Sequence, residues 1–136
     1  MKELVLRTAL VRVAPSPIHG LGVFAEENIR GGSLVAEYIG HIITIEAGVR
    51  LVANGKGQFL FGLRSGMVLD GSVSWNTPAK FINHSCRGNC LTFAKEDRVL
   101  VYALLNIRQG VELTYNYGPG YFDRFILPRG CNCPEC

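Results

Sequence analysis

The segment Phe81-Ile82-Asn83-His84-Ser85-Cys86 constrains what this chain can be more than any other stretch. It places an amide, an imidazole, a hydroxyl and a thiol in four consecutive residues, directly after an apolar pair. Each of these groups costs free energy to bury without a partner, so a segment that only filled a core would not have this composition. Three other unusual segments lie far away along the chain, and a function must explain why they occur together: residues 19–22, 112–118 and 131–136.

The composition predicts a small β-rich domain. A chain of 136 residues is most simply one domain, and 48% of apolar residues is enough for a packed core. Sixteen glycines and six prolines indicate many turns. Frequent turns favour short strands over long helices, so we expect one or two short helices at most.

Apolar patterning predicts individual elements. The run Leu34–Ile43 is apolar and β-like. Thr44 is a suitable N-cap, and Ile45, Val49 and Val52 recur at helical spacing, so a helix of about three turns is expected there. Further strands are expected at residues 4–13 and 23–25, with a break at 15–17. Two hairpins are expected, one formed by residues 59–63 and 67–69 and the other by residues 91–94 and 99–104, and a helical turn is expected at 78–82.

Charge and hydropathy exclude several classes of function. Lysine and arginine outnumber aspartate and glutamate by only 14 to 11, and no run of like charges occurs, so direct nucleic-acid binding is not expected. No apolar stretch approaches the length of a membrane span. Residues 1–13 contain several charges and lack the unbroken apolar region of a secretory signal. A reducing compartment, cytoplasmic or nuclear, is therefore expected.

The cysteines predict a metal site. Cys131, Cys133 and Cys136 form a Cys-x-Cys-x-x-Cys cluster, which supplies three thiolates where a structural zinc site needs four. The fourth ligand must then be Cys86 or Cys90. Such clustering near one end of the chain suits a metal better than a disulfide framework. A zinc ion would bring the end of the chain against the polar segment described above.

Two further motifs are compatible with a binding site. Gly20-Leu21-Gly22 lets the backbone approach a ligand closely, because neither glycine has a Cβ, although a plain tight turn explains it equally. Tyr115 and Tyr117 lie two apart on an extended segment, so their rings point to the same side and can share a polar pocket. The alternative is two half-buried aromatic residues with solvated hydroxyls.

The polar segment also contains the elements of a thiol enzyme. His84 and Cys86 would be the base and the nucleophile, but neighbours in sequence seldom have the required geometry. A zinc-bound Cys86 could not be a nucleophile at all, and Ser85 has no Asp–His partner pattern. A thiol enzyme stays open as one alternative, and His84 taken alone is more simply a structural histidine.

These motifs, in this order, resemble those of the SET-domain protein lysine methyltransferase family over nearly the whole chain. Phe81–Cys86, followed by Asn89, is similar to the family's Phe-x-Asn-His-Ser-Cys-x-Pro-Asn signature. The segment 107–118 is similar to its Ile-x-x-Gly-Glu-Glu-Leu-Thr-Tyr-Asp-Tyr-Gly signature. The other matches are a Gly-x-Gly segment at 18–25, a Glu-Tyr-x-Gly strand end at 37–40, the step at 69–70 and a zinc-binding tail.

The resemblance implies a fold and a domain organisation. The fold is mainly β: the SET-domain fold (β-clip), with several small sheets, one or two short helices and a knot-like crossing. In that crossing the segment that ends at Tyr117 passes beneath a loop next to Asn83–Cys86. The implied parts are a SET domain at residues 1–118 and a zinc-binding post-SET tail at residues 119–136.

The resemblance also implies an activity and the residues that perform it. The activity is methyl transfer from S-adenosylmethionine to a lysine side chain of a protein or peptide partner such as a histone tail, with Zn²⁺ as a structural metal. The implied site residues are, for catalysis, Tyr117, Tyr115 and Tyr38; for the methyl donor, Gly20, Leu21, Gly22, Asn83, His84 and Tyr117; and for zinc, Cys86, Cys131, Cys133 and Cys136.

The chemistry of methyl transfer agrees with these assignments. It is an in-line displacement whose chief requirement is alignment of amine, methyl and sulfur. An apolar channel and the adjacent sulfonium both disfavour the ammonium form of the lysine, so no dedicated base is needed. Tyr115 stands where the family has Phe or Tyr, and a second hydroxyl there predicts monomethylation.

Departures from the family pattern leave an alternative open. Gly88 replaces the usual proline, and the adjacent Cys90 competes with Cys86 as the fourth zinc ligand. No cysteine-rich segment precedes the domain, and this compact form is similar to bacterial or viral members, whose acceptor belongs to a host. The second function considered is a catalytically inactive SET-like binding module that contains zinc.

Overall fold

Short strands in three small sheets make up most of the structure, a computed structural model that describes residues 8–57, 59–73, 78–118 and 130–133. Among these residues there is one α-helix, which agrees with the predicted β-rich domain. The elements are β1 (Val11–Pro15), β2 (Leu21–Ala25), β3 (Leu34–Tyr38), β4 (His41–Ile43), α1 (Ile45–Ala53), β5 (Leu60–Gly62), β6 (Val68–Asp70), the 3-10 turns η1 (Gly71–Val73) and η2 (Pro78–Phe81), β7 (Asn83–His84), β8 (Cys90–Lys95), β9 (Arg98–Ala103) and β10 (Glu112–Tyr115).

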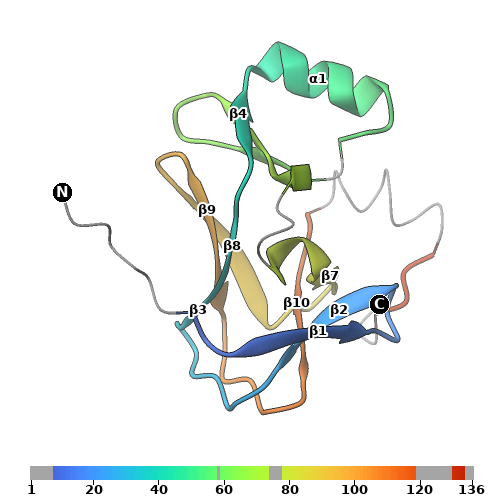
Figure 1. Cartoon of the computed structure of the whole chain (residues 1–136), viewed down its shortest axis with the longest axis vertical. Helices are drawn as coiled ribbons and strands as arrows, with labels where there is room; N and C mark the ends of the chain where they lie inside the picture. The colour runs from blue at the N-terminus through green and yellow to red at the C-terminus, as the bar shows by residue number, and fades with distance from the viewer. Residues whose placement is uncertain (1–7, 58, 74–77, 119–129, 134–136) are drawn as a thin grey trace.

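The first sheet joins strands from both ends of the described chain. Its order is β1-β2-β10-β7. β10 pairs antiparallel with β2 and parallel with β7. Figure 1 shows β10 running beside β2 and the short β7 near the middle of the molecule. The two motif-bearing segments, at β7 and β10, are therefore neighbours although about 30 residues separate them in the sequence.

The second sheet supplies much of the core. It is antiparallel in the order β3-β9-β8, and β8 and β9 form the predicted hairpin with Lys95 opposite Arg98. Val99 and Val101 of β9 are buried in the same cluster as Leu113 of β10. The first and second sheets thus share one core, which lies behind the polar segment and holds it in place.

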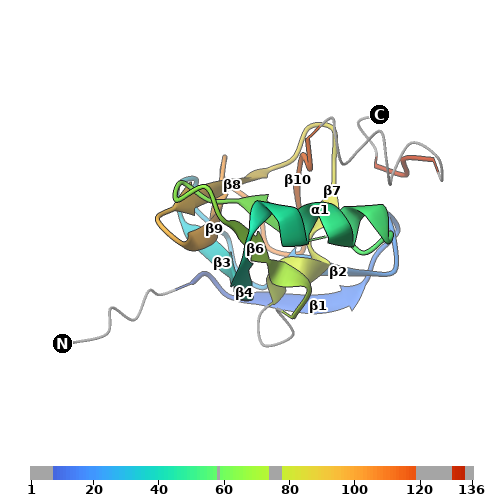
Figure 2. The ribbon, with the colours of Figure 1, turned by 90° about the horizontal axis from the view of Figure 1, so that it is seen from above.

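The third sheet and the helix form an outer unit, here defined as β4, α1, β5 and β6. The sheet order is β4-β6-β5, and α1 lies over this unit at one end of the molecule (Figures 1 and 2). Thr44 Oγ1 accepts a hydrogen bond from the Ala47 N–H (3.1 Å), which confirms the predicted N-cap. The helix buries only Gly48, whereas Ile45 and Val49 are more than half exposed. Within the described residues no helix has the length and apolar character needed to cross a membrane.

The run Leu34–Ile43, predicted to be β-like, contains two strands. The run divides into β3, which pairs with β9, and β4, which pairs with β6 in a different sheet. The change of sheet occurs at Gly40, where a Cβ would lie 1.9 Å from the carbonyl oxygen of Asp70. Because no side chain fits so close to a backbone oxygen, glycine is required where the run leaves one sheet for the next.

The predicted strand at residues 4–13 is displaced. β1 begins at Val11 and continues to Pro15, where a break was predicted, and residues 1–7 lie outside the described part of the chain. Pro15 pairs with Leu21 at the loop end of the β1–β2 hairpin. A proline is tolerated at the last position of a strand because it removes no donor from the interior of the ladder.

The loop between β7 and β8 lies across β10. A Cβ on Gly88 would lie 2.4 Å from Tyr115 Cα, so loop and strand backbones are in contact. Asn89 grips the strand at two points: its Nδ2 donates to the Glu112 carbonyl and its Oδ1 accepts from the Thr114 N–H, both at 2.9 Å. This close passage agrees with the crossing that the family resemblance implies.

A short sequence motif occurs twice, and its second copy directly precedes β10; the repeat was not anticipated from the sequence. Residues 28–32 and 106–110 share the pattern Asn-Ile-Arg-x-Gly. Ile29 and Ile107 exchange backbone hydrogen bonds of 2.7 and 2.8 Å, and the asparagine of each copy accepts a backbone N–H from the other copy. This pairing holds the chain at the point where it enters β10.

Candidate active site

The site is built on a junction, here defined as residues 82–89 together with β10. β7 runs parallel to β10 with His84 opposite Tyr115, and the Ser85 N–H donates to the Tyr115 carbonyl (3.2 Å). Asn83, His84 and Ser85 are each more than nine-tenths buried. No buried side-chain nitrogen or oxygen among the described residues lacks a hydrogen-bond partner. The partners that the polar segment needs are therefore present.

Asn83 connects the junction to the glycine segment, here defined as residues 18–22. Its Nδ2 donates to the carbonyls of His19 (3.1 Å) and Leu21 (3.0 Å) and lies 3.0 Å from Oε2 of Glu112. The Ser16 hydroxyl donates to the same carboxylate, at 2.8 Å from Oε2. The structure thus brings together two of the pieces that sequence analysis assigned to the methyl donor.

The two glycines of this segment are needed for different reasons. Gly20 has φ +48°, in the left-handed region that favours glycine, and the space beside it is open. At Gly22 a Cβ would lie 2.3 Å from Glu112 Oε2 and 2.9 Å from the Cβ of Ser16. Gly22 therefore leaves room for the carboxylate that holds Asn83, while Gly20 turns the backbone toward open space.

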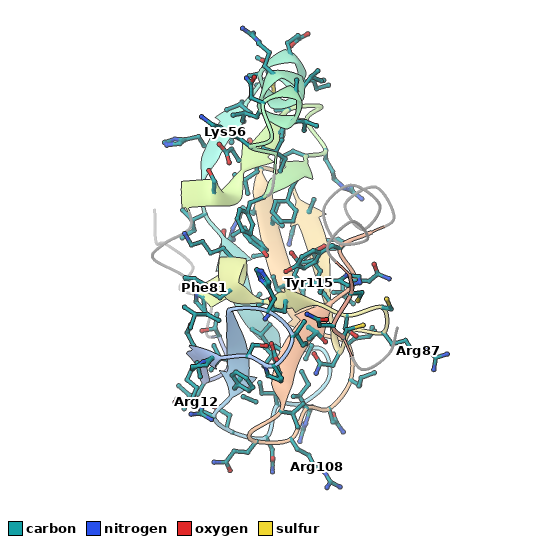
Figure 3. All side chains as sticks on the ribbon, turned by 90° about the vertical axis from the view of Figure 1, so that its right-hand side faces the viewer. Arg12, Lys56, Phe81, Arg87, Arg108 and Tyr115 are labelled. Atoms are coloured by element: carbon teal, nitrogen blue, oxygen red, sulfur yellow. The ribbon has the colours of Figure 1, made fainter. Side chains whose placement is uncertain are left out.

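The three predicted tyrosines lie together. The hydroxyl oxygens of Tyr38 and Tyr115 are 2.7 Å apart, and the ring centroids of Tyr115 and Tyr117 are 4.8 Å apart. The Tyr117 hydroxyl donates to the Ile82 carbonyl, and the Tyr38 ring contacts Phe61 at a centroid distance of 4.4 Å. Figure 3 shows Tyr115 inside the molecule, between the outer unit and the strands β1 and β2. The prediction that Tyr115 and Tyr117 point to the same side is confirmed.

Sulfur atoms gather at one edge of the junction. The Cys86 N–H donates to Cys133 Sγ (3.4 Å), and Cys131 Sγ lies 3.4 Å from Cys133 Sγ. Burial and the neighbouring Cys133 thiol raise the pKa of Cys86. Cys131 is in a disulfide, whereas Cys86 and Cys133 are not disulfide-bonded. The predicted ligand Cys136 lies outside the described residues.

The described part of the tail also contacts the glycine segment. Asn132, between Cys131 and Cys133, donates from Nδ2 to the Ile18 carbonyl (3.2 Å). Figure 1 shows this segment, in red, beside the end of the β1–β2 hairpin. The glycine segment is therefore held from two directions, by Asn83 and by the tail.

A model of the SET domain matches residues 20–118, which is more than half of the chain. The chain belongs to the SET-domain family. The match covers both parts of the junction and Gly20–Gly22, whereas Ser16 and the thiols of the tail lie outside it.

Known relatives of this SET domain are much longer proteins. Histone-lysine N-methyltransferase 2D of Homo sapiens is 34% identical over 135 residues, which are 93% of this chain and 2% of that protein. The histone-lysine N-methyltransferase of Schizosaccharomyces pombe named as H3 lysine-4 specific is 36% identical over 140 residues, 96% of this chain and 15% of that protein. The chain thus spans a small part of the relatives it matches.

Solved structures confirm the predicted SET-domain fold. An active polycomb repressive complex 2 in the stimulated state contains a chain with a TM-score of 0.73 and 28% identity, covering 88% of this chain and 16% of that one. The Chaetomium thermophilum complex in an autoinhibited conformation, bound to S-adenosylmethionine, gives a TM-score of 0.66 and 29% identity, covering 82% of this chain and 15% of that one.

The two candidates for the fourth zinc ligand lie in different environments in this SET domain. Cys90 is only 3% exposed, its Sγ donates to Asn89 Oδ1 (3.4 Å), and burial raises its pKa to about 12. Such a thiol resists the ionisation that a metal ligand needs. Cys86 is partly exposed and lies against Cys133. The surroundings favour Cys86 as the ligand and Cys90 as a core thiol.

Three polar residues of the site were missed as site residues. Ser16 and Glu112 support Asn83, and Asn89 fixes the loop to β10. Asn89 and Glu112 belong to the family signatures, so those signatures contained the information. Ser16 meets Glu112 across 96 residues of sequence, and no short-range pattern indicates such a contact.

Proposed function

We propose that this SET domain is an S-adenosylmethionine-dependent protein-lysine N-methyltransferase. The observation that carries the proposal is the connection, through the junction, of a buried tyrosine cluster with a glycine segment whose outer face is open. The relatives support the same activity, because their names describe histone-lysine N-methyltransferases. A structural neighbour bound to S-adenosylmethionine supports the methyl donor.

The glycine segment and β7 fit the methyl donor. Gly20 has no atom within 4 Å of a Cβ position, and Leu21 is 47% exposed, so this backbone can lie directly against a ligand. Asn83 holds two carbonyls of the segment in place. We assign the methionine end of the donor to Gly20–Gly22, and the remainder to Asn83, to the His84 main chain and to Tyr117. When bound, S-adenosylmethionine supplies an electrophilic methyl on a sulfonium.

The tyrosine cluster fits the acceptor. We place the target lysine between Tyr38, Tyr115 and Tyr117, whose rings exclude water and whose oxygens can orient an amine and a methyl group. The Tyr117 hydroxyl, held by the Ile82 carbonyl, has a fixed direction. A free lysine has a pKa of about 10.4, and an apolar channel beside a positive charge lowers it, so the amine can lose its proton to water as it enters the channel.

The paired hydroxyls favour monomethylation. Tyr38 and Tyr115 are hydrogen-bonded to each other at 2.7 Å, so two hydroxyls stand beside the proposed amine position. A methylated amine is larger and has fewer N–H donors for these oxygens. A second methyl transfer would therefore be disfavoured by both space and hydrogen bonding.

The thiol cluster fits a structural zinc ion. Zn–S bonds of about 2.3 Å in a tetrahedral site place sulfurs ~3.8 Å apart, close to the 3.4 Å between Cys131 and Cys133. We assign the metal to Cys86, Cys131, Cys133 and Cys136 and the tail 119–136 to a post-SET segment. Metal binding requires Cys131 in its reduced form, and a bound cation would favour thiolates where the metal-free cluster raises the pKa of Cys86.

The partner we propose is a protein that carries an accessible lysine, with histone tails as the first candidates. The relatives' names support a histone acceptor, and they support a nuclear location for the same reason. The neighbours belong to a multisubunit complex, so additional protein partners are part of the proposal.

The decisive experiment compares the wild type with Tyr117→Phe. The reduced, zinc-loaded chain is incubated with labelled donor and with histone octamers, and methylated products are measured by mass spectrometry. We expect products one methyl heavier. Loss of the Tyr117 hydroxyl should lower kcat at least about a hundredfold while donor binding, measured by calorimetry, persists. Tyr102→Phe, on β9 and outside the cluster, is the matched control.

Two outcomes would contradict the proposal. If the wild type fails to bind the donor, the inactive binding module becomes the better description of this chain. If it contains no metal and Cys86 reacts rapidly with alkylating reagents, the thiol-enzyme alternative gains support, because a zinc-bound Cys86 is not a free nucleophile.

A further inference from the structure

We propose that His84 is a positioning residue that connects the thiol cluster to the backbone of Tyr117, as a hydrogen-bond donor to the Cys86 sulfur and not as a metal ligand. The proposal rests on the proposed function for the catalytic part of its consequence. Its structural part, the position of one proton on the imidazole, stands independently of any activity.

The His84 side chain lies between two functional groups from different parts of the site. It is 4% exposed. The Tyr117 N–H donates to its Nδ1 (3.1 Å), and its Nε2 lies 3.4 Å from Cys86 Sγ. The imidazole also packs edge-on against the Tyr117 ring, with centroids 5.3 Å apart. Both nitrogens are therefore engaged, one by the proposed catalytic tyrosine and one by the cluster.

The Tyr117 contact determines which nitrogen carries the proton. A backbone N–H can only donate, so Nδ1 must accept and cannot carry hydrogen. A neutral imidazole has one N–H, which must then be on Nε2, facing Cys86. Sulfur accepts this hydrogen bond, and it does so better as a thiolate than as a thiol. The structure assigns His84 the Nε2–H tautomer with Cys86 as its acceptor.

The same argument decides between two roles toward a metal. On distance alone His84 is a candidate ligand, because its ligand atom and those of Cys86 and Cys131 all lie within 4.8 Å of one another. A ligating Nε2 has no proton, so Nδ1 would carry it and would face the Tyr117 N–H, donor against donor. The geometry is therefore that of a group which donates to a ligand sulfur and orients it.

Tyr117 is held at two points by this one segment. Its N–H is bound by His84 and its hydroxyl by the Ile82 carbonyl. The position of the phenol thus depends on the orientation of the imidazole, which in turn depends on Cys86. A metal that fixes Cys86 as a thiolate would strengthen the Nε2–H contact and, through it, the placement of Tyr117.

Two substitutions of His84 separate its two contacts. The amide oxygen of asparagine falls near the position of Nδ1, so His84→Asn keeps an acceptor for Tyr117 and loses the donor to Cys86. The amide of glutamine reaches the position of Nε2, so His84→Gln keeps a donor to Cys86 and loses the acceptor for Tyr117. His41→Asn, at an exposed position on β4, is the control for the exchange itself.

We expect opposite losses from the two variants. His84→Gln should lower kcat for methyl transfer at least about tenfold with a smaller change in KM, because the phenol is misplaced. His84→Asn should lower kcat less, but should weaken zinc affinity about 10- to 100-fold in competition with a chelator. Equal losses in both measurements for both variants would overturn the proposal, since they would indicate only general damage to the fold.

Cobalt substitution tests the metal role without any activity. Co²⁺ spectra distinguish four sulfur ligands from three sulfurs and one nitrogen. If His84 is a donor, Co²⁺-loaded wild type and His84→Asn should both have the all-sulfur spectrum. A nitrogen signature in the wild type that disappears in the variant would make His84 a ligand and sink the assignment.

A measurement on the unaltered zinc-loaded protein covers the case in which neither variant folds. The ¹⁵N chemical shifts and couplings of the His84 ring report directly which nitrogen carries hydrogen. We expect the Nε2–H form, and an Nδ1–H form would contradict the proposal. Because neither the cobalt nor the NMR result requires methyl transfer, failure of the proposed function and failure of this inference are distinguishable.

Discussion

The junction and the outer unit are stabilised in opposite ways. In the junction, polar side chains are buried and bonded to segments up to 96 residues away, as with Ser16 and Glu112. In the outer unit, α1 buries only Gly48 and leaves Val49 exposed, and its clearest side-chain bond is the local cap at Thr44. The junction therefore depends on the placement of individual atoms, whereas the outer unit depends on local propensity and partial apolar packing.

A matched pair of glycine substitutions is the strongest test of this difference between the junction and the outer unit. Gly22 and Gly62 both lie in strands without positive φ, one beside the junction and one in the outer unit. A Cβ at Gly22 would displace the Glu112 carboxylate from its hydrogen bonds with Asn83 and Ser16, whereas at Gly62 it would meet nothing within 4 Å. We expect Gly22→Ala to lower the free energy of unfolding by about 3 kcal/mol.

The outer-unit member of the pair should behave differently. Gly62→Ala restricts the unfolded chain and adds no clash, so it should change stability by less than about 1 kcal/mol, with gain as the expected direction. Urea denaturation monitored by circular dichroism measures both variants. Similar losses at both positions would show that the junction is no more demanding than the outer unit.

A smaller effect is expected from the buried thiol beside the junction. Burial raises the pKa of Cys90 to about 12 from 9.0, so the folded chain keeps a proton that the unfolded chain releases above about pH 9. Stability from this group is complete below pH 9 and is lost as the pH rises from 9 toward 12. The loss approaches about 1.4 kcal/mol per pH unit for one such proton.

The variant Cys90→Ala isolates this contribution. Its free energy of unfolding should fall less steeply between pH 9 and 10.5 than that of the wild type, because other titrating groups are common to both and cancel in the difference. Parallel curves for the two proteins would mean that Cys90 ionises equally in the folded and unfolded states. The thiol would then not be shielded from solvent in the core.

The same contrast explains what could be predicted from the sequence. The outer unit follows local rules, and its helix cap, its helix and its hairpin were all predicted from patterns within about ten residues. The apolar character of Leu34–Ile43 is the same in both of its sheets, so it does not show where the chain passes from one sheet to the other. The close approach of Gly40 to Asp70 shows that point.

The junction was predicted only in its parts. The polar composition of residues 83–86 indicated that partners were needed, and the spacing of Tyr115 and Tyr117 indicated a shared side. No periodicity indicates that β10 pairs in parallel with a two-residue strand, or that Ser16 supports Glu112. These contacts are long-range, so their information lies in the family signatures and in the coordinates and not in any local window.

The last prediction concerns the N-cap of α1 and tests whether the outer unit depends on local contacts. Thr44 Oγ1 satisfies one of the N–H groups at the start of the helix, and Thr44→Ala should cost about 1 kcal/mol, since few other contacts anchor the helix. Thr44→Ser keeps the hydroxyl and should lie within about 0.5 kcal/mol of the wild type. Hydrogen exchange of the α1 amides is the more telling measurement, because the loss should open the outer unit while β10 amides stay protected. Equal loss of protection in α1 and β10 would mean that the two regions unfold as one unit, and the division drawn between them would then describe their chemistry but not their stability.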